Sequence, residues 1–596
     1  MPAAATRLRE VLAGHQATLH GPLPKLQLPG DDVLLSPFIR EAASIISESH
    51  LHPHLAPHLF RRDTLPIVPV PGSRRFIPMK PEYFVSWADR HFAPVKTRYD
   101  KSGDPFDVIR PMTKEVARNC LESLDFTLAM PPIKRTFPVP APVIPDDGGP
   151  MRLCRPGYDT LTGAFVFDAD FLPDPELCAP GDGMITSGGY YDEHLSLHAA
   201  VTYLHNLLGD MPFSDWSDSH CPAEGSPFHD MEHPRRTIRL SRSLAVQIMA
   251  MLSVFAAGCV PAQANRLGFL VNANKQRSGK TLLVKICITP IYGATKTQSW
   301  RENDEDMIKI LDSETIAATS YICFDNIRSL IASSPLEGFM TAPTWTGRIL
   351  GRSEMFEAEN NATLFFTANN ASLGPDMQER ILISDLYVET ADRQDRGTEL
   401  DPSREIDDVW LSRPDNRRRI LSALWAIVRH WDAAGRPPAS GTPRKGFATW
   451  CRILGGMVEF AGFGDCLERP RDLENCGDAE TDDIRALVEY CSRDTRGREC
   501  TFQEIVHILW EKGLVPWCLH GREEYVEDLQ KLSLKLNDAC NARLGMLLQR
   551  NCSGERGEIH IFKSPGSDRT RRVRFYCRGK GRSRRFHFDE IRDEIP

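Results

Sequence analysis

The feature that most constrains this chain is a short apolar run, residues 267–271 (LGFLV), followed by a turn that contains Gly279-Lys280-Thr281. An apolar run of this length before turn residues is typical of a buried strand. The residues after the turn, 282–288, are mostly apolar and lead to Pro290, before which we expect a helix to end. The sequence therefore predicts a strand, a loop and a helix in direct succession.

The loop has the composition of a phosphate-binding loop. Successive backbone N–H groups at a helix N-terminus bind phosphate, because the helix dipole favours an anion there. Gly279 would let the backbone approach, Lys280 would reach the β- and γ-phosphates, and Thr281 would ligate Mg²⁺. Asn274 stands where the motif has its first glycine, and Asn is well able to adopt a positive φ. We therefore predict ATP and Mg²⁺ as cofactors, with the nucleotide-binding residues Asn274, Ser278, Gly279, Lys280, Thr281 and Leu282.

A second apolar strand, residues 321–324, ends in Asp325, about 45 residues after Lys280. A carboxylate at this place would join Thr281 as a metal ligand beside the phosphates. By itself, such an Asp is more often a helix cap at the end of a core strand. Asn326 occupies the position where many such ATPases carry a water-activating Glu. Either another residue acts as the base, or turnover is slow.

The third predicted strand, residues 363–368, ends in Asn369 and Asn370. We select Asn369 to orient the attacking water or to sense the γ-phosphate, with Asn370 as a close second and a plain strand-to-turn pair as the alternative. Arg380 follows about ten residues later and is predicted to act as an arginine finger in a neighbouring subunit's site. A surface salt bridge is the alternative for Arg380. The predicted catalytic residues are Lys280, Asp325, Asn369 and Arg380.

A hairpin is predicted over residues 344–353, between the second and third motifs. It places Arg348 and Arg352 near its tip, where their guanidinium groups would grip DNA phosphates in a central channel. Ordinary surface arginines are nearly as good an interpretation.

Together these motifs resemble the helicase-type ATPases of phages and integrative elements, which are AAA+ relatives of the superfamily 3 helicases. The resemblance rests on residues 279–283, 324–326, 336–351, 367–370 and 375–380, and weaker similarity extends over about 150–470. It implies an α/β fold with an AAA+-type P-loop core, and a ring, expected to be a hexamer, that hydrolyses ATP between subunits and moves DNA. It also implies that any primase is a separate chain.

A chain of 596 residues is too long for one core, so we expect several domains. These are a flexible arm (1–60), a mixed α+β domain (61–185), the P-loop ATPase domain (186–400), a helical lid (401–478) and a winged-helix domain with a basic tail (479–596). No targeting segment is visible, no two cysteines have C-x-x-C spacing, and the apolar run 244–260 is too short to span a bilayer. We expect a cytoplasmic protein with no membrane partner.

The last segment predicts a winged helix. A capping box at Thr501 and Glu504 opens a helix over 505–512, a second helix covers about 526–548, and two strands follow at 558–562 and 571–576. A solvated charged face is the usual interpretation of a basic run, but the whole chain has a net charge of −8, so we favour DNA contact here. The predicted DNA-binding residues of this segment are Lys531, Lys535, Arg571, Arg572 and Arg574. Phe575, Tyr576, Phe586 and Phe588 interleave with the basic residues and are expected to stack on bases or to insert into DNA.

Three functions fit these observations. The first is an ATP-driven DNA translocase or replicative helicase of a mobile genetic element. The second is a DNA-stimulated ATPase that remodels or regulates without unwinding. The third is a nucleotide-binding scaffold for DNA assemblies with little turnover, which Asn274 and Asn326 keep open.

Overall fold

The structure is a computed structural model. It describes residues 23–29, 34–49, 59–70, 74–145, 147–167, 170–178, 184–273, 277–327, 331–349, 354–369, 371, 373–388, 406–468, 487–493, 498–511, 548, 552, 558–563, 570–578 and 584–591. The chain divides into two compact units. The first comprises Met1–Asp325, Ser333–Thr367 and Arg380–Leu467, and the second comprises Asn326–Ala332, Ala368–Glu379 and Glu468–Pro596.

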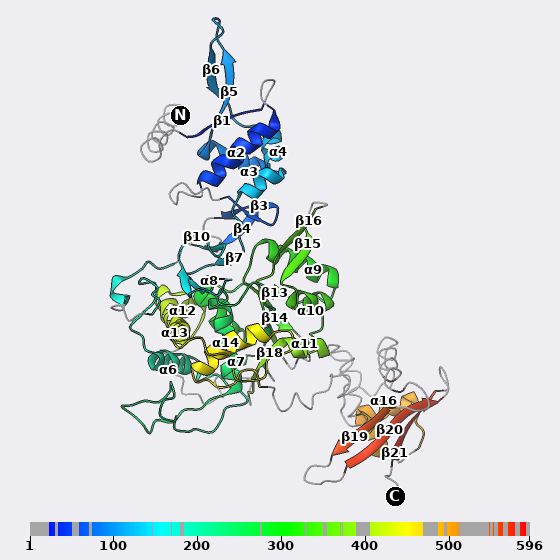
Figure 1. Ribbon diagram of the computed structural model, residues 1–596. Coiled ribbons are helices and arrows are strands. Elements are labelled where there is room, and N and C mark those ends of the chain that lie inside the picture. Colours follow the sequence, from blue (N-terminus) through cyan, green and yellow to red (C-terminus); the bar gives the residue numbers. More distant parts are fainter. Residues whose placement is uncertain are drawn as a thin grey trace. The chain divides into compact units, whose positions relative to one another are not determined.

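The first unit begins with small sheets and short helices (Figure 1). Strands β1 (Lys25–Gln27), β5 (Ala93–Tyr99) and β6 (Pro105–Ile109) form one sheet, and β2 (Phe60–Arg62), β3 (Leu65–Val70) and β4 (Arg75–Pro78) form another. The helices are α2 (Leu35–Ser49), α3 (Pro81–His91), α4 (Lys114–Leu121) and α5 (Leu124–Ala129).

These helices share one apolar core with β1, and the core corrects the predicted flexible arm over residues 1–60. Leu26, Phe38 and Ile46, which fall in that range, are buried in it. Helix α2 places apolar residues on one face and packs against α5, so ordered structure starts well before residue 60.

Short strands then connect to the central part of the first unit. They are β7 (Arg135–Phe137), β8 (Ala141–Val143), β9 (Arg152–Cys154), β10 (Gly157–Asp159) and β11 (Ala164–Val166), and a 3-10 turn covers Pro175–Leu177. Strand β8 lies in a proline-rich stretch, residues 137–150, whose prolines exclude a helix.

A five-stranded sheet forms the centre of this unit, with strand order β13-β14-β17-β12-β18. The strands are β12 (Gly268–Ala273), β13 (Gln298–Ser299), β14 (Tyr321–Ile327), β17 (Thr363–Asn369) and β18 (Ile381–Leu386). Strand β12 pairs with β18 in parallel, and so does β13 with β14. Parallel pairs in a sheet accompanied by helices are typical of an α/β arrangement.

Helices surround this sheet and supply most of its apolar core. They are α6 (Leu197–Leu208), α7 (Arg242–Phe255), α8 (Lys280–Tyr292), α12 (Asp408–Ser412), α13 (Pro414–Ala433) and α14 (Ala448–Phe460). Helices α9 (Asp304–Ile316) and α10 (Ser334–Met340) belong to the same unit outside this core cluster, whereas α11 (Pro375–Arg380) falls in the second unit except for its last residue. Leu421, Leu424, Trp425 and Val428 of α13 are all buried in this core. In the part of the chain that the structure describes, no helix is both long and apolar enough to cross a membrane.

Helix α8 corrects one boundary. We expected it to stop before Pro290, but it continues to Tyr292 and ends on Gly293 in a left-handed conformation (φ 78°). The last carbonyl groups of a helix need partners, and buried Arg417 provides them. Its Nε donates to the Pro290 carbonyl at 2.9 Å and its Nη2 donates to the Ile291 carbonyl at 3.1 Å. Arg417 thus satisfies the end of a helix that continues two residues past its proline.

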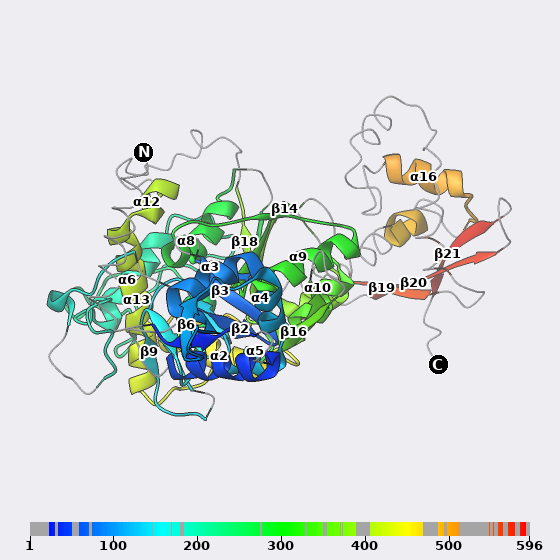
Figure 2. The same cartoon turned by 90° about the horizontal axis from the view of Figure 1, so that it is seen from above.

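The second unit contains α16 (Phe502–Glu511) and an antiparallel sheet of β19 (Glu558–Lys563), β20 (Thr570–Arg578) and β21 (Arg585–Ile591) in that order. Figure 2 shows α16 on one side of this sheet. The capping box is confirmed: Thr501 Oγ1 accepts from the Glu504 N–H at 3.2 Å, and Glu504 Oε2 accepts from the Thr501 N–H at 2.7 Å.

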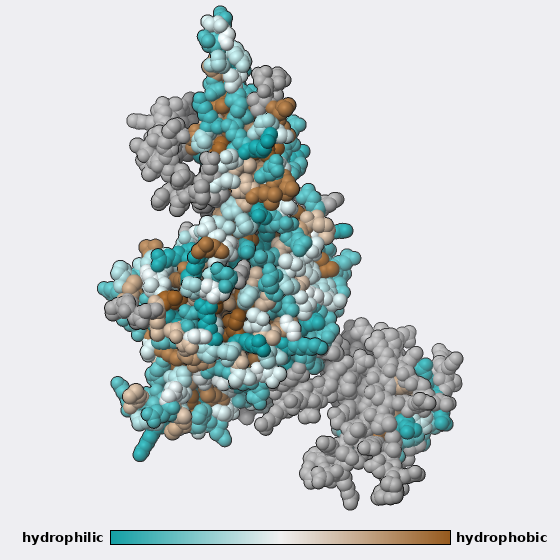
Figure 3. Space-filling view, viewed as in Figure 1, coloured by the Kyte–Doolittle hydropathy of each residue, from teal (hydrophilic) through white to brown (hydrophobic). Residues whose placement is uncertain are grey.

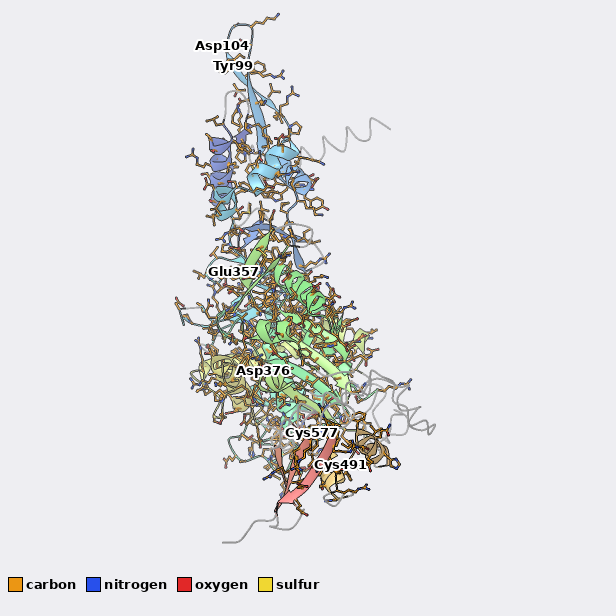
Figure 4. The ribbon with its side chains drawn as sticks, turned by 90° about the vertical axis from the view of Figure 1, so that its right-hand side faces the viewer. Tyr99, Asp104, Glu357, Asp376, Cys491 and Cys577 are labelled. Carbon is orange, nitrogen blue, oxygen red and sulfur yellow. The ribbon has the colours of Figure 1, made fainter. Side chains whose placement is uncertain are left out.

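The same unit departs from the predicted helices and hairpin in one respect, since β21 is a third strand that the sequence analysis did not identify. The second predicted helix, with Lys531 and Lys535, lies outside the described residues. Cys491 and the residues of β20 and β21 build the core here (Figure 4).

Candidate phosphate-binding site

The described part of the loop after β12, residues 277–279, has left-handed backbone conformations at two positions. Arg277 (φ 59°) and Gly279 (φ 100°) both adopt left-handed conformations, and Gly279 caps the N-terminus of α8. A Cβ on Gly279 would meet only Met211 Sδ, at 3.7 Å, an ordinary contact. The position therefore needs glycine for its conformation and not for space. Asn274 lies outside the described residues, so its predicted positive φ stays a prediction.

Lys280 begins α8 and is 8% exposed. Its Nζ donates to Ser278 Oγ at 3.4 Å, so these two predicted residues lie together. Burial lowers the pKa of Lys280 from its ordinary value, and the nearby Asp325 carboxylate partly opposes this shift. The ammonium group is thus held in surroundings where an anionic ligand would stabilise its charge.

Asp325 lies within hydrogen-bonding distance of the start of α8. Thr281 Oγ1 donates to Asp325 Oδ1 at 3.2 Å, which brings together the two predicted metal ligands. Thr367 Oγ1 donates to the same oxygen from β17. Thr281 lies at the start of α8, Asp325 near the end of β14 and Thr367 near the end of β17, so three separate elements bring these oxygens together. Hydroxyl and carboxylate oxygens are the donors that Mg²⁺ prefers, so the set fits that ion.

Thr367 was missed by the sequence analysis, although a signal was present. It lies two residues before Asn369 in the same strand, so both side chains project from one face of β17. Thr367 is 1% exposed, and a buried hydroxyl requires a hydrogen-bond partner. The Asp325 carboxylate is that partner, which makes Thr367 a residue that fixes the orientation of the carboxylate.

The remaining predicted site residues have less defined surroundings. Leu282 is half-buried against the apolar core. Asn369 is the last residue of β17 and Arg380 is the last residue of α11, so both have the predicted places at element ends, and their roles stay predictions. Asn370 lies outside the described residues. Asn326 has a φ of 58°, a conformation that Asn adopts far more readily than Glu.

The predicted hairpin is confirmed as β15 (Thr344–Arg348) and β16 (Met355–Glu359), which pair antiparallel; Figure 4 labels Glu357 on β16. Arg348 is exposed at the tip end of β15, whereas Arg352 lies outside the described residues. Buried Asp312 of α9 holds the hairpin, because it accepts from Trp345 Nε1 at 2.7 Å and from the Arg348 N–H at 3.0 Å.

The second unit contains the predicted basic strand, and its aromatic residues require a correction. Arg571, Arg572 and Arg574 lie on β20, and Arg574 is exposed. Phe575, Phe586 and Phe588 are buried in the core, where the Phe575 and Phe588 rings stack with centroids 4.9 Å apart. Tyr576 is 8% exposed, stacks on His587 and donates to Asp589 Oδ2 at 2.7 Å. The prediction that these four rings stack on bases is therefore wrong, because each ring already packs against other side chains of the sheet.

Comparisons with known proteins add little. No protein-family model matches the chain, and no curated protein matches it. One solved structure that matches is the apo A form of the NrS-1 C-terminal region, CTR(305-718). The two are 12% identical, the match covers 54% of this chain and 69% of that chain, and the TM-score is 0.23. A likeness at this level carries no argument about fold or function.

Proposed function

We propose that this chain is an ATP-driven DNA translocase or helicase, the replicative helicase of a mobile genetic element, with an AAA+-type core, a helical lid and a C-terminal winged helix. One observation carries the proposal. Buried Lys280 and the hydroxyl of Thr281 begin α8 beside the Asp325 carboxylate, behind a left-handed Gly279. A cation, a hydroxyl and a carboxylate at a helix N-terminus form a site for a nucleoside triphosphate with its metal.

Each residue has a separate role in the proposed reaction. The N–H groups at the start of α8 and Lys280 bind the β- and γ-phosphates. Thr281 and Asp325 hold Mg²⁺, which neutralises charge on the phosphate oxygens when bound. Thr367 orients Asp325 through its hydroxyl. Asn369 orients the attacking water, and Arg380 of one subunit reaches the nucleotide of the next.

The DNA contacts in this proposal come from two basic elements. Arg348 is exposed on a hairpin whose position Asp312 fixes, so its guanidinium is carried on a rigid support. Arg574 is exposed on β20 of the second unit, beside Arg571 and Arg572 in sequence. The assembly is a ring, hexameric by the resemblance, that works beside a separate primase.

Asn326 bears on the alternatives. Its left-handed backbone gives a conformational reason for Asn at this position, so the missing Glu does not by itself favour an inactive scaffold. A DNA-stimulated remodelling ATPase without unwinding uses the same site, and only strand displacement separates it from a helicase.

The test is ATP hydrolysis with and without single-stranded DNA, for the wild type and for Lys280→Ala. Lys285→Ala is the matched control, since Lys285 lies on the same helix and pairs with Asp408 at 2.7 Å, away from the phosphates. We expect Lys280→Ala to lose hydrolysis by at least about 100-fold and Lys285→Ala to keep it.

Strand displacement on forked DNA completes the test. Nucleotide binding without hydrolysis in the wild type would exclude both enzyme functions and leave the scaffold. Hydrolysis that DNA stimulates, without displacement of a strand, would support the remodelling ATPase instead of the helicase.

A further inference from the structure

A two-stranded hairpin extends from the N-terminal helices of the first unit, and neither the ATPase site nor the basic C-terminal strand accounts for it. It consists of β5 and β6, and it reaches beyond α2, α3 and α4 (Figure 1). Tyr99 and Asp104 mark its far end (Figure 4). Its surface is mainly hydrophilic (Figure 3). Phe106 is nevertheless 47% exposed on it, so a large apolar ring faces solvent among polar side chains.

The register divides the hairpin into two faces. Lys96 pairs with Val108 and Arg98 pairs with Phe106, so these four side chains share one face. Arg110 follows on the same face by alternation, and its N–H donates to the Pro94 carbonyl at 2.9 Å. Lys96, Arg98 and Arg110 are all exposed. We call this surface the cationic face.

On the opposite face, the carboxylate of Asp107 is paired with a lysine of the same sheet. Asp107 accepts from Lys25 Nζ at 2.8 Å and from Thr97 Oγ1 at 3.1 Å, and Gln27 Nε2 donates to Thr97 Oγ1 at 2.8 Å. The pKa of Asp107 is lowered by these hydrogen bonds, that from Lys25 first. Lys25 and Gln27 belong to β1, which pairs with β5, so this face is tied to the sheet.

The turn contains two acids, Asp100 and Asp104, and the first of them is engaged within it. Asp100 Oδ1 accepts from the Ser102 N–H at 2.8 Å and from the Asp104 N–H at 2.9 Å, which fixes the carboxylate within the turn. Along the paired strands, therefore, the described residues of the cationic face carry three positive side chains and no carboxylate.

Three cations around an exposed phenyl ring suit a single strand of nucleic acid. The cations contact consecutive phosphates, and an unpaired base stacks on the ring without regard to its identity. A duplex hides its base faces, so it would leave Phe106 without a partner. Arg98 lies directly opposite Phe106 in the register, which places one phosphate contact beside the stacking position.

We propose that the cationic face of the β5–β6 hairpin binds single-stranded DNA, with Lys96, Arg98 and Arg110 on phosphates and Phe106 stacked on a base. The choice of DNA rests on the proposed function, but the binding itself needs neither nucleotide nor hydrolysis.

The test uses the full chain without nucleotide and a fluorescent oligo(dT) strand, over a series of salt concentrations. The triple variant Lys96→Ala/Arg98→Ala/Arg110→Ala should bind at least about tenfold more weakly, and the log–log salt slope should fall by about 2, since each lost phosphate contact removes about 0.7. Phe106→Ala should weaken binding by about fivefold or more. The control Lys80→Ala/Lys114→Ala/Arg118→Ala removes three exposed cations from the neighbouring helical region and should leave both quantities unchanged.

Photo-cross-linking gives a second readout, which other DNA sites in the chain do not mask. A photo-reactive benzoylphenylalanine is placed at position 106, and the control carries it at position 99 on the opposite face. We expect cross-links to the oligonucleotide from position 106 and few from position 99. Three results would overturn the proposal. The triple variant could bind as tightly as the wild type, the control triple variant could weaken binding equally, or position 106 could cross-link to protein instead of DNA. If the chain hydrolysed no ATP but still bound DNA at this face, the binding proposal would stand and the proposed motor function would fail.

Discussion

The candidate phosphate-binding site and the DNA contact of the C-terminal segment were both predicted from sequence, by signals of different kinds. The site was predicted from spacing: a strand, a loop with Lys280 and Thr281, and a second strand that ends in Asp325. The DNA contact was predicted from composition, because arginines and aromatic residues interleave in one stretch. In the structure, Thr281 donates a hydrogen bond to Asp325, as the spacing suggested, whereas Phe575, Phe586 and Phe588 are buried in the core of the sheet.

The difference has a physical cause. A motif that ends a strand fixes where its residue lies, since the ends of neighbouring parallel strands meet at one edge of a sheet. Composition does not fix which face a residue occupies, because alternate residues of a strand point in opposite directions. On β20, Val573 and Phe575 point inward and Arg574 points outward. Exposed cations therefore accompany a buried aromatic core, and the two need not act together on DNA.

The largest effect should come from Phe575→Ala. Loss of a fully buried aromatic ring costs about 3–5 kcal/mol, so amide hydrogen exchange in β20 and β21 should accelerate by at least about 100-fold. Arg574→Ala, one residue away, should leave exchange unchanged but lower the salt slope of DNA binding by about 1. If Phe575→Ala weakened DNA binding while exchange stayed at the wild-type rate, the ring would be a stacking residue after all.

Asp325→Asn should have the next largest effect. The amide keeps the shape of the side chain but loses the charge that would hold Mg²⁺, so we expect metal-dependent ATP hydrolysis to fall by about 100-fold. Thr367→Val removes only the hydroxyl that donates to Asp325, and a decrease of about tenfold should follow. Steady-state hydrolysis over a Mg²⁺ titration measures both. Full activity of Asp325→Asn would show that the carboxylate is a core cap, the alternative that its sequence context left open.

Much of the centre of the fold was predictable, because its strands are continuous apolar runs and its helices have one apolar face. The strand before the Lys280 loop, the strand of Asp325 and the strand of Asn369 were all identified, and so was helix α16. Long-range partners were not predictable. Nothing near Pro290 in sequence indicates that Arg417 accommodates the helix end, and nothing near Trp345 indicates Asp312. These contacts join residues far apart in the chain, and only the folded structure brings them together.

The hairpin of β15 and β16 tests whether such a long-range contact affects function. A Cβ on Gly347 would lie 2.1 Å from Asp312 Oδ1, so Gly347→Ala must displace the hairpin from α9. We expect DNA stimulation of ATP hydrolysis to fall by about tenfold while basal hydrolysis persists, because the phosphate site is unchanged. Thr346→Ala, at an exposed neighbouring position, is the control. Equal stimulation of the wild type and Gly347→Ala would separate the hairpin from DNA binding.

The smallest effect concerns the charge of Lys280. Burial lowers its pKa, so in the free site its ammonium group loses the proton at a lower pH than an ordinary lysine does. Phosphate binding favours the charged form, so nucleotide binding takes up a proton at any pH at which the free lysine has lost its own. Affinity should fall as pH rises on the alkaline side, above the titration of a terminal phosphate near about 6, by at most about tenfold per pH unit. Lys280→Arg keeps its charge throughout, so its affinity for a fluorescent ATP analogue should stay level over the same range even where it is weaker than the wild type. A pH profile that is the same for both would mean that the ammonium group of Lys280 does not meet the phosphates. That outcome would remove the charge contact from the site while leaving the backbone N–H groups of α8 as its anion-binding element.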